Sequence, residues 1–426
     1  TKMDILINAL SLAFLLSLTG YAVMLGFGNM RVARATVETA VVERELLRKR
    51  IDQLTDQQRF VREKGGLSWN GYRKFEVLRK VQEGGGICSF YLAPHDKKDL
   101  PPFEPGQYLT FQLPIPGQRK PVVRCYSLSD SPYHPECYRV SIKALPPPRK
   151  EPDAPPGLSS NYFHDSINET DILDVKAPGG HFFMDTTKHT PVVLIGGGVG
   201  ITPVMSMLNQ ICESGSTREV WFFYGVTNGS EHIMREHMER LASEHENVTL
   251  QICYSRPGDD DVQGQDYHHA ERVSVDLFKR VLPSSNYDYY MCGPGPMMSS
   301  VVEGLTEWGV PEKHIHFEAF GPATVKKATP DKPAAEKAAA AAGIEVIFAK
   351  SGKTLKWDPE IDSLLEFAEE NDVDIEFGCR AGSCGTCITA IREGDVTYMV
   401  EPGSPPEAGS CLTCISVPKT SITLDA

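Results

Sequence analysis

Four cysteines near the C-terminal end constrain this chain more than any other feature of its 426 residues. They have the spacing C-x4-C-x2-C followed by a distant cysteine: Cys379, Cys384, Cys387 and Cys414. Three glycines interrupt the same loop: Gly378, Gly382 and Gly385. Glycine lets backbone amides approach a bound group closely, and zinc usually requires two C-x2-C pairs, so the spacing favours a 2Fe-2S cluster. A disulfide is the other alternative, and a reducing compartment would disfavour it.

Composition narrows the remaining possibilities. With 41% hydrophobic and 23% charged residues, the chain is long enough for two or three folded modules. Its formal net charge of -13 argues against nucleic acid as a partner. The eleven cysteines are spread along the chain, which fits reduced thiols plus a cofactor better than a disulfide framework.

The N-terminal segment Ile5–Phe27 carries no charged residue. At about 1.5 Å per residue it could cross a hydrocarbon core of about 30 Å, which predicts a single transmembrane anchor within residues 1–29. A cleaved signal peptide is the alternative, but its apolar region would be shorter. Basic residues between positions 31 and 50 outnumber Lys2. We therefore expect a single-pass protein of the inner (cytoplasmic) membrane, with a charged juxtamembrane helix over 30–66 and cytoplasmic catalytic domains.

Residues 67–187 alternate short runs of β-forming residues with turns rich in Pro and Gly, which predicts an antiparallel β-barrel. One run contains Arg124, Tyr126 and Ser127 in the pattern R-x-Y-S. This pattern resembles a motif of the ferredoxin-reductase family of flavoproteins. The resemblance implies that Arg124 binds a cofactor phosphate, that Tyr126 stacks on the flavin and that Ser127 lies near its reactive nitrogen N5.

The segment GLSSNYF, residues 157–163, resembles the G-x-x-S-N-Y-L of the same family. In that family a helix N-terminus and small residues receive the cofactor diphosphate, which implies this role for Gly157, Ser160 and Asn161. A mononucleotide lacks the second phosphate. The expected flavin is therefore FAD rather than FMN.

Residues 188–322 open with a strand-like run, VVLI, that leads into a glycine-rich turn and a helix. Such a turn between a strand and a helix suits a pyrophosphate. It resembles the G-G-G-x-G-x-T-P of the same family, which assigns the nucleotide to Gly196, Gly197, Gly198, Gly200, Thr202 and Pro203. Strand and helix patterns alternate afterwards, so we expect an α/β domain with a parallel sheet and the nicotinamide at its strand ends.

Two motifs near the end of that domain complete the expected site. Cys292, Gly293 and Pro294 resemble the family's C-G-P, which implies that Cys292 positions the nicotinamide. The resemblance also implies that Phe320 covers the flavin ring until the nicotinamide displaces it. Glu318 is either an acid near the flavin or one half of a structural pair.

The choice between NADH and NADPH depends on one loop. Ser255 and Arg256 lie where some family members bind a 2'-phosphate. Three consecutive carboxylates, at 259–261, follow directly and should repel that phosphate. We expect NADH, with NADPH as the alternative.

Residues 323–342 are rich in Pro, Ala and Lys and predict a semi-flexible linker. In residues 343–426, two strands, a helix and the cysteine loop resemble the β-grasp fold of plant-type ferredoxin. Cys411 competes with Cys414 as the last ligand, and the family's L-x-C pattern implies Cys414. Fifteen acidic and six basic residues give this domain a net charge of about -9, which favours a partner with a basic docking face. An acidic surface that serves only solubility is the alternative.

These features together predict a multidomain fold: a single N-terminal transmembrane helix, an antiparallel β-barrel FAD domain, an α/β nucleotide-binding domain and an α+β β-grasp ferredoxin domain. The order of the last three resembles reductase components that serve oxygenases and hydroxylases. We expect electrons to pass from NADH through FAD to a 2Fe-2S cluster, then to a membrane-associated oxygenase, hydroxylase or desaturase. The lipid bilayer is the other expected partner. A flavoprotein subunit of an NADH:quinone reductase is the alternative function.

Overall fold

The computed structural model describes residues 15–21, 24, 66–118, 121–134, 136–147, 154–318, 320, 343–378, 380, 382, 385–399, 402 and 406–426. The chain divides into two units, Thr1–Gly66 and Leu67–Ala426. The predicted juxtamembrane helix and linker lie outside the described residues, apart from Gly66. So do two of the four predicted cluster ligands, Cys379 and Cys384.

The predicted membrane anchor is wrong. Among the residues that the structure describes, no helix is both long and apolar enough to cross a bilayer. Within the expected span only residues 15–21 and 24 are described, and they are helical. The transmembrane part of the predicted fold and the single-pass location in a cytoplasmic membrane are corrected accordingly.

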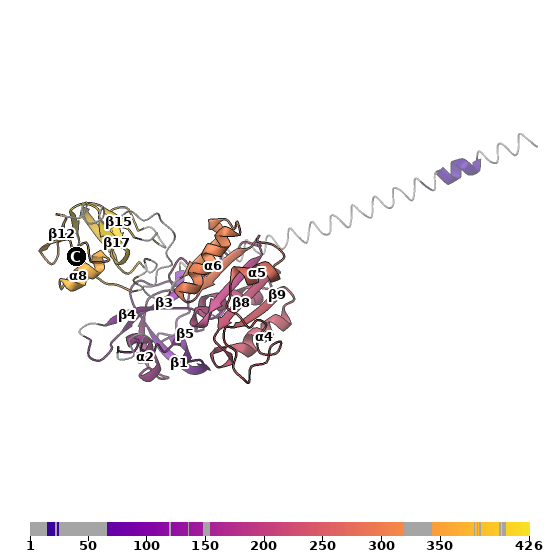
Figure 1. The fold of residues 1–426 in the computed structure, drawn as a ribbon, viewed down its shortest axis with the longest axis horizontal. Coiled ribbons are helices and arrows are strands. Elements are labelled where there is room, and N and C mark those ends of the chain that lie inside the picture. Colours follow the sequence, from indigo (N-terminus) through magenta and orange to yellow (C-terminus); the bar gives the residue numbers. More distant parts are fainter. Residues whose placement is uncertain are drawn as a thin grey trace, which may run out of the picture. The chain divides into compact units, whose positions relative to one another are not determined.

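An antiparallel barrel opens the second unit (Figure 1). Its strands are β1 (Arg73–Gly84), β2 (Ile87–Pro94), β3 (Tyr108–Leu113), β4 (Val122–Ser127), β5 (Tyr138–Lys143) and β6 (Ile172–Val175). They are ordered β4-β3-β6-β1-β2-β5, and an antiparallel bridge between Leu128 and Val140 joins the two ends. Helix α2 (Leu158–Asp165) covers the interior by placing Phe163 against Phe90 and Phe111, with ring centroids 5.2 and 5.3 Å apart.

A five-stranded parallel sheet follows, ordered β11-β10-β7-β8-β9. Its strands are β7 (Val192–Gly197), β8 (Val220–Val226), β9 (Val248–Tyr254), β10 (Asp288–Cys292) and β11 (Ile315–Glu318). The helices are α3 (Ile201–Glu213), α4 (Arg235–Glu244), α5 (Val275–Val281) and α6 (Gly295–Glu307). Strand β7 lies at the centre, where both faces of the sheet are covered.

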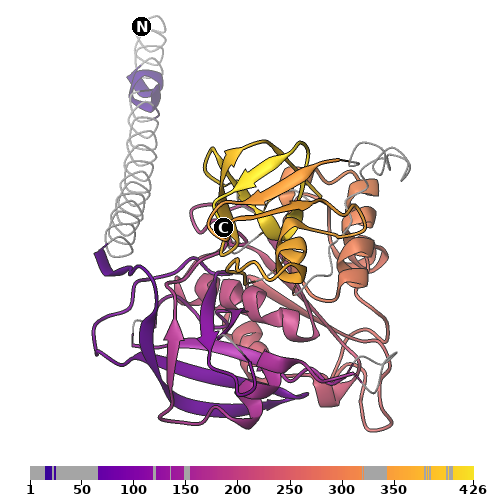
Figure 2. The same ribbon diagram turned by 90° about the vertical axis from the view of Figure 1, so that its left-hand side faces the viewer.

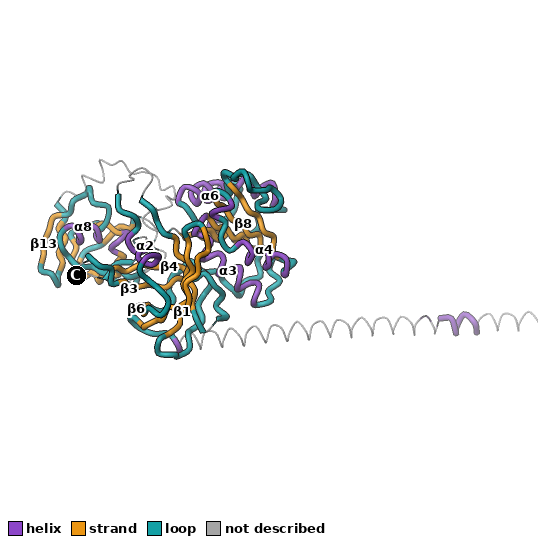
Figure 3. Tube along the Cα trace, turned by 90° about the horizontal axis from the view of Figure 1, so that it is seen from below, coloured by secondary structure: helices purple, strands orange, loops and turns teal. Residues whose placement is uncertain are grey.

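The run VVLI explains that coverage. Successive side chains of a strand point to opposite faces, so Val192 and Leu194 belong to one core and Val193 and Ile195 to the other. Helices α3 and α4 pack on the first face, and α5 and α6 on the second. Figure 3 shows α6 on one side of β8 and α3 and α4 on the other.

The C-terminal part forms a mixed five-stranded sheet, ordered β13-β12-β18-β14-β16 (Figure 2). Its strands are β12 (Glu345–Phe348), β13 (Lys353–Lys356), β14 (Ile388–Glu393), β16 (Ser410–Leu412) and β18 (Ile422–Leu424). A two-stranded ribbon of β15 (Val396–Tyr398) and β17 (Ser416–Pro418) lies beside them. Helix α8 (Leu364–Glu370), capped by the Ser363 hydroxyl, packs Phe367 against Trp357 at 5.1 Å. This arrangement places the cysteine loop between α8 and β14.

Candidate functional site

The predicted flavin residues lie on β4 at one end of the barrel sheet. Ser127 is the last residue of the strand and is buried. The Tyr126 hydroxyl donates to Ser159 Oγ at 3.1 Å, and its ring meets the edges of Phe111 and Phe163. Burial raises the pKa of Tyr126 to about 12, so the phenol stays neutral at physiological pH. A neutral, immobilised ring is suited to stacking on a flat cofactor.

The start of α2 is built to receive a phosphate group closely. A Cβ at Gly157, the residue that precedes the helix, would lie 2.7 Å from Ser160 Oγ and 2.8 Å from Leu145 Cβ, so only glycine fits. The first amides of a helix have no acceptor within it and can bind an anion. Asn161 uses its side-chain amide to hold the carbonyls of Leu145 and Gly157. Asn161 therefore shapes this turn, and the residues present fit the diphosphate of FAD.

Arg124 lies between the barrel and the C-terminal domain. Its guanidinium is half-buried and donates to the Val123 carbonyl at 2.7 Å. Burial is the largest influence that lowers its pKa, with the nearby Arg380 adding to the effect. The Arg124 guanidinium carbon also lies 6.0 Å from the centre of the Phe377 ring. Sequence reasoning assigned Arg124 to a phosphate alone and missed this second neighbour.

The glycine-rich turn joins β7 to α3, as its spacing predicts. The turn continues as a short 3-10 segment, Gly198–Gly200, in which Gly198 has a φ of +54°. A Cβ at Gly200 would overlap the carbonyl of Cys292, and a Cβ at Gly197 would lie 2.8 Å from Pro294 and from Met297 Sδ. Small residues thus let two strand ends approach each other. The glycine-rich turn is therefore held closely against the end of β10.

Thr202 and Pro203 are buried in the first turn of α3, where the Thr202 hydroxyl donates to the Val199 carbonyl at 3.1 Å. Their side chains stabilise the turn from within. Gly196 and Gly293 are also close to neighbouring backbone or side-chain atoms across the turn. The structure therefore brings together the residues that the resemblance assigned to the nucleotide at this edge.

Cys292 and Glu318 end two neighbouring strands. Cys292 is the last residue of β10 and fully buried, and Glu318 is the last residue of β11 and 8% exposed. Burial and the charge of Glu318 raise the pKa of the Cys292 thiol well above its ordinary value. The sequence left the role of Glu318 open, and the structure places it in register with Cys292.

Phe320, Ser255 and Arg256 are less buried than Cys292 and Glu318. Phe320 is 41% exposed, which leaves its ring accessible to a flat ligand. Ser255 and Arg256 follow β9, and their backbone amides donate to the carbonyls of Val226, the last residue of β8, and Thr227, the next residue. The Arg256 side chain is exposed. The predicted roles of all three residues stay predictions.

The sequence did not predict the hydrogen bonds of the carboxylates that follow β8 and β9. Glu231 accepts a hydrogen bond from the Thr227 hydroxyl at 2.9 Å. Asp261 accepts from the backbone amides of Gly229 and Gly258 at 3.2 and 2.7 Å. The sequence suggested that the carboxylates at 259–261 repel a 2'-phosphate, but it could not show that Asp261 is fixed by backbone amides from two loops.

Two predicted cluster ligands meet in the C-terminal domain. Cys387 and Cys414 are buried, and their sulfur atoms lie 3.1 Å apart, which is well beyond a disulfide bond length of about 2.05 Å. Gly382 has a φ of +73°, and a Cβ there would overlap Ile415, so the loop requires glycine. Converging soft sulfur donors on a glycine-containing loop fit a 2Fe-2S cluster. Within the part of the chain that the structure describes, no group of three metal-binding side chains forms.

A polar network between the barrel and the parallel sheet was not predicted. Asp130, after β4, accepts from Asn209 of α3 at 3.2 Å and lies 3.5 Å from the Arg139 guanidinium. His237 of α4 is 2.7 Å from Asn209 Oδ1. The Ser206 hydroxyl donates to the Asp130 carbonyl at 2.6 Å. These contacts fix the flavin strand against the nucleotide domain.

Comparison with known proteins identifies the class. Three family models match consecutive parts of the chain: an oxidoreductase FAD-binding domain over 75–184, an oxidoreductase NAD-binding domain over 194–303, and a 2Fe-2S iron-sulfur cluster binding domain over 347–419. The protein is therefore a pyridine-nucleotide-dependent iron-sulfur flavoprotein oxidoreductase. The predicted cofactors, FAD, a nicotinamide dinucleotide and a 2Fe-2S cluster, are confirmed at the level of these domains.

The curated proteins that resemble this chain include flavohemoproteins. The flavohemoprotein of Bacillus thuringiensis subsp. konkukian is 42% identical over 255 residues, which make up 60% of this chain and 62% of that protein. The flavohemoprotein of Bordetella pertussis is 39% identical over 253 residues, or 59% and 61% of the two chains. The chain thus spans about three fifths of the length of these curated relatives.

Solved structures show the same modules. The FAD/NAD-binding domain of a nitric oxide dioxygenase from Vibrio cholerae O1 biovar El Tor is 30% identical, with a TM-score of 0.52, and is matched over its whole length by 59% of this chain. A phthalate dioxygenase reductase shares the fold over 84% of this chain and 98% of its own, with 24% identity and a TM-score of 0.52. The chain belongs to the ferredoxin-reductase family of flavoproteins and carries a C-terminal 2Fe-2S domain. These modules are oxidoreductase FAD- and NAD-binding domains followed by the 2Fe-2S domain.

Proposed function

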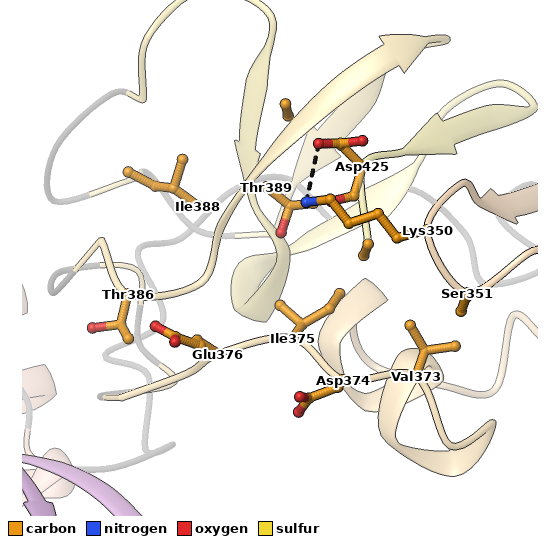
Figure 4. A pocket seen from close by; sticks show the side chains of 12 residues that line it. Lys350, Ser351, Val373, Asp374, Ile375, Glu376, Thr386, Ile388, Thr389 and Asp425 are labelled. Carbon is orange, nitrogen blue, oxygen red and sulfur yellow. Dashed lines mark hydrogen bonds and ion pairs between the residues drawn. The ribbon is translucent and has the colours of Figure 1, made fainter.

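We propose that this reductase supplies single electrons, from NADH, to a separate oxygenase or hydroxylase protein that docks through a basic face. The observation that carries the proposal is a pocket of about 480 Å³ beside the cluster loop (Figure 4). Thr386 and Ile388, which flank the predicted ligand Cys387, line it. The prediction that the acceptor is a membrane protein and the bilayer a second partner stays a prediction.

The lining of the pocket suits a protein partner. Ile388 is 48% exposed, although large apolar side chains are usually buried. Asp374 and Glu376 also line the pocket, and the Lys350 ammonium is 3.1 Å from an Asp425 carboxylate oxygen. An exposed apolar side chain with carboxylates around it is typical of a docking surface for a basic partner. Such charges chiefly raise the rate of association.

A flavin bound at β4 would supply the chemistry that connects a two-electron hydride donor to a one-electron acceptor such as a 2Fe-2S cluster. The chain's own residues would hold these groups in order. The neutral thiol of Cys292 borders the nicotinamide position, β4 holds the flavin, and Cys387 and Cys414 hold the cluster. The phthalate dioxygenase reductase is described as a modular structure for electron transfer from pyridine nucleotides to a 2Fe-2S centre, and the shared domain order supports the same direction here.

A basic one-electron acceptor tests the proposal. With cytochrome c as the probe and NADH as the donor, Asp374→Lys should raise the KM for cytochrome c at least threefold at low ionic strength. Asp395→Lys is the matched control, because Asp395 pairs with Lys419 at 3.2 Å, away from the pocket lining. An unchanged KM in Asp374→Lys, with cluster content equal to the parent protein, would contradict docking at this pocket.

A quinone acceptor is the competing function. Reduction of a soluble ubiquinone analogue should be much slower than reduction of cytochrome c, and both should respond to loss of the cluster. Quinone reduction that exceeds cytochrome c reduction and persists in Cys414→Ser would favour the quinone reductase instead.

A further inference from the structure

An ion pair joins the barrel to the 2Fe-2S domain. Lys176 directly follows β6, and its ammonium lies 3.9 Å from a carboxylate oxygen of Glu376, which lies between α8 and the cysteine loop. The side chains of Lys176 and Glu376 are 31% and 75% exposed. The field of Glu376 also reaches Tyr72, whose pKa is raised to about 12, first by burial and then by Glu376. The Lys176 ammonium lies 5.1 Å from the centre of the Tyr72 ring.

The residue next to Glu376 makes a second contact. The ring of Phe377 lies near two guanidinium groups, with Arg380 of its own domain at 4.0 Å and Arg124 of the barrel at 6.0 Å. Arg380 is held by an ion pair with Glu369 of α8. A guanidinium within about 6 Å of an aromatic ring is attracted to it. The segment Glu376–Phe377 therefore contacts the barrel through one charge and one ring.

The pairing of β3 with β6 and with β4 places both contacts close to the strand that carries Arg124. Phe111 of β3 pairs with Val175 on one side and with Arg124 of β4 on the other. Lys176, the residue after Val175, thus lies next to the row that carries Arg124. On the other domain, Glu376 and Phe377 precede the first predicted ligand, Cys379, by three and two positions. The contact joins the edge of the flavin site to the start of the cluster loop.

We propose that Lys176 and Glu376 form the docking contact through which the 2Fe-2S domain receives electrons from the flavin domain. Lys176 and Glu376 are positioning residues that act through the placement of the two cofactors. The contact concerns transfer within the chain. It therefore holds or fails independently of the proposed external acceptor.

The strength of the contact suits a temporary arrangement. Exposed ion pairs are individually weak and are weakened further by salt. Glu376 also lines the pocket proposed for the acceptor, and Figure 4 shows it beside Thr386 at the edge of that pocket. Glu376 thus lies both in the contact with the barrel and at the edge of that pocket.

Charge reversal tests the contact kinetically. Without an acceptor, one NADH delivers two electrons; the cluster takes one and the flavin keeps the other. In stopped-flow absorbance at low ionic strength, Lys176→Glu or Glu376→Lys should slow cluster reduction at least threefold, with flavin reduction by NADH unchanged. The double variant Lys176→Glu/Glu376→Lys should recover the parent rate. Raising the salt concentration should remove most of the difference between parent and single variants.

Matched controls carry the same charge changes elsewhere. Lys97→Glu alters an exposed barrel lysine that pairs with Glu76 at 3.3 Å, and Asp395→Lys alters a carboxylate of the 2Fe-2S domain that pairs with Lys419 at 3.2 Å. In both control variants the cluster should be reduced at the same rate as in the parent protein. The proposal is overturned if the cluster in Glu376→Lys is also reduced at the parent rate at low salt. It is likewise overturned if cluster reduction in the double variant is no faster than in the single variants.

A second readout needs neither cofactor nor turnover. Carbodiimide coupling joins a lysine to a carboxylate in contact, so digestion and mass spectrometry should find a Lys176–Glu376 crosslink that is lost in Glu376→Gln. The Lys350–Asp425 pair, at 3.1 Å within the 2Fe-2S domain, is the internal positive control. Recovery of the control crosslink without the Lys176–Glu376 crosslink would overturn the proposal.

Discussion

Cys292 and Glu318 lie directly opposite each other as the last residues of the neighbouring parallel strands β10 and β11. Both side chains are buried, so the carboxylate acts on the thiol in a region of low dielectric. Burial and this carboxylate both disfavour the thiolate, and they raise the pKa of Cys292 well above its ordinary value. Cys292 is therefore a neutral thiol at the end of β10, the position that the sequence motif assigns to the nicotinamide.

The rate of flavin reduction by NADH should consequently show no ionisation of Cys292 between about pH 6 and 9, a range that spans the ordinary thiol pKa. Cys292→Ser retains a small neutral polar group and should keep the rate within about tenfold, a change of roughly 1.4 kcal/mol in the barrier. Stopped-flow measurements across this pH range check both statements. A rate that rises with a midpoint near the ordinary thiol pKa of about 8.5, and loses that step in Cys292→Ala, would contradict the neutral thiol.

Gly200→Ala should destabilise the nucleotide domain. The added Cβ would overlap the backbone carbonyl of Cys292, which a side-chain rotation cannot relieve. Forced overpacking costs about 1 to 3 kcal/mol, which corresponds to a fall of several degrees in Tm. Thermal unfolding measures this fall in Tm. Gly258→Ala is the control, because its nearest neighbour, Asp261 Oδ2, would lie at an ordinary 3.5 Å. Equal Tm values for the two variants would argue against the close approach.

Cys414→Ser should abolish the visible absorption and the electron paramagnetic resonance signal of the cluster, while NADH still bleaches the flavin. Cys411→Ala is the matched control. Cys411 lies on β16 opposite Thr389, whereas Cys414 lies 3.1 Å from Cys387. The control variant should retain the cluster. Loss of the cluster in Cys411→Ala with retention in Cys414→Ser would reverse the assignment of the fourth ligand.

Arg124→Ala should release FAD more readily, because it removes a charged donor from the flavin strand. Hydrogen bonds to charged groups contribute about 1.5 to 3 kcal/mol, so the Kd for FAD should rise roughly ten- to a hundredfold. Flavin occupancy after gel filtration measures the effect. Arg79→Ala removes a guanidinium that stacks on Tyr91 at 3.9 Å on the same barrel, and it should leave occupancy unchanged. The assignment of Arg124 fails if both variants retain FAD equally.

Acidification should destabilise the packing of barrel and nucleotide domain. Burial, aided by the charges of Arg139 and Arg240, lowers the pKa of His237 to about 4. An unfolded histidine titrates near about 6.5, so between that pH and about 4 the unfolded chain binds a proton that the folded chain does not. Stability should therefore fall by about 1.4 kcal/mol per pH unit through this window from His237 alone.

His237→Gln provides the matched variant for that prediction. The introduced glutamine amide could still donate to Asn209 and accept from Arg240 but would not titrate, so the fall in Tm from about pH 7 to 5 should be smaller. Identical pH dependence in the parent protein and in His237→Gln would show that the imidazole does not titrate as described. His232, whose pKa burial also lowers to about 4, accounts for part of the remaining dependence.

Local sequence patterns predicted much of the fold. The R-x-Y-S residues lie on a barrel strand, the glycine-rich turn lies between β7 and α3, and the predicted helix before the cysteine loop is α8, which Ser363 caps. Each of these depends on neighbours within a few positions, so spacing alone is informative. The predicted membrane helix is wrong, since no helix in the described part of the chain is long and apolar enough to cross a bilayer.

Contacts between distant residues could not be predicted. Nothing in the sequence near Lys176 indicates that it meets Glu376, and nothing near His237 indicates the network that leads to Asp130. The same holds for the pairing of Cys292 with Glu318, which requires the order of strands in the sheet. These relationships appear only once strand order and domain contacts are defined.

The closeness of Cys387 and Cys414 has a consequence for the lifetime of the protein. A cluster held by both sulfurs would close a loop of 27 residues that contains β14 and β16. By the loop-entropy argument used for covalent cross-links, closing a loop of that length is worth roughly 3 to 4 kcal/mol. The C-terminal domain with a bound cluster should therefore resist proteolysis better than the same domain without it.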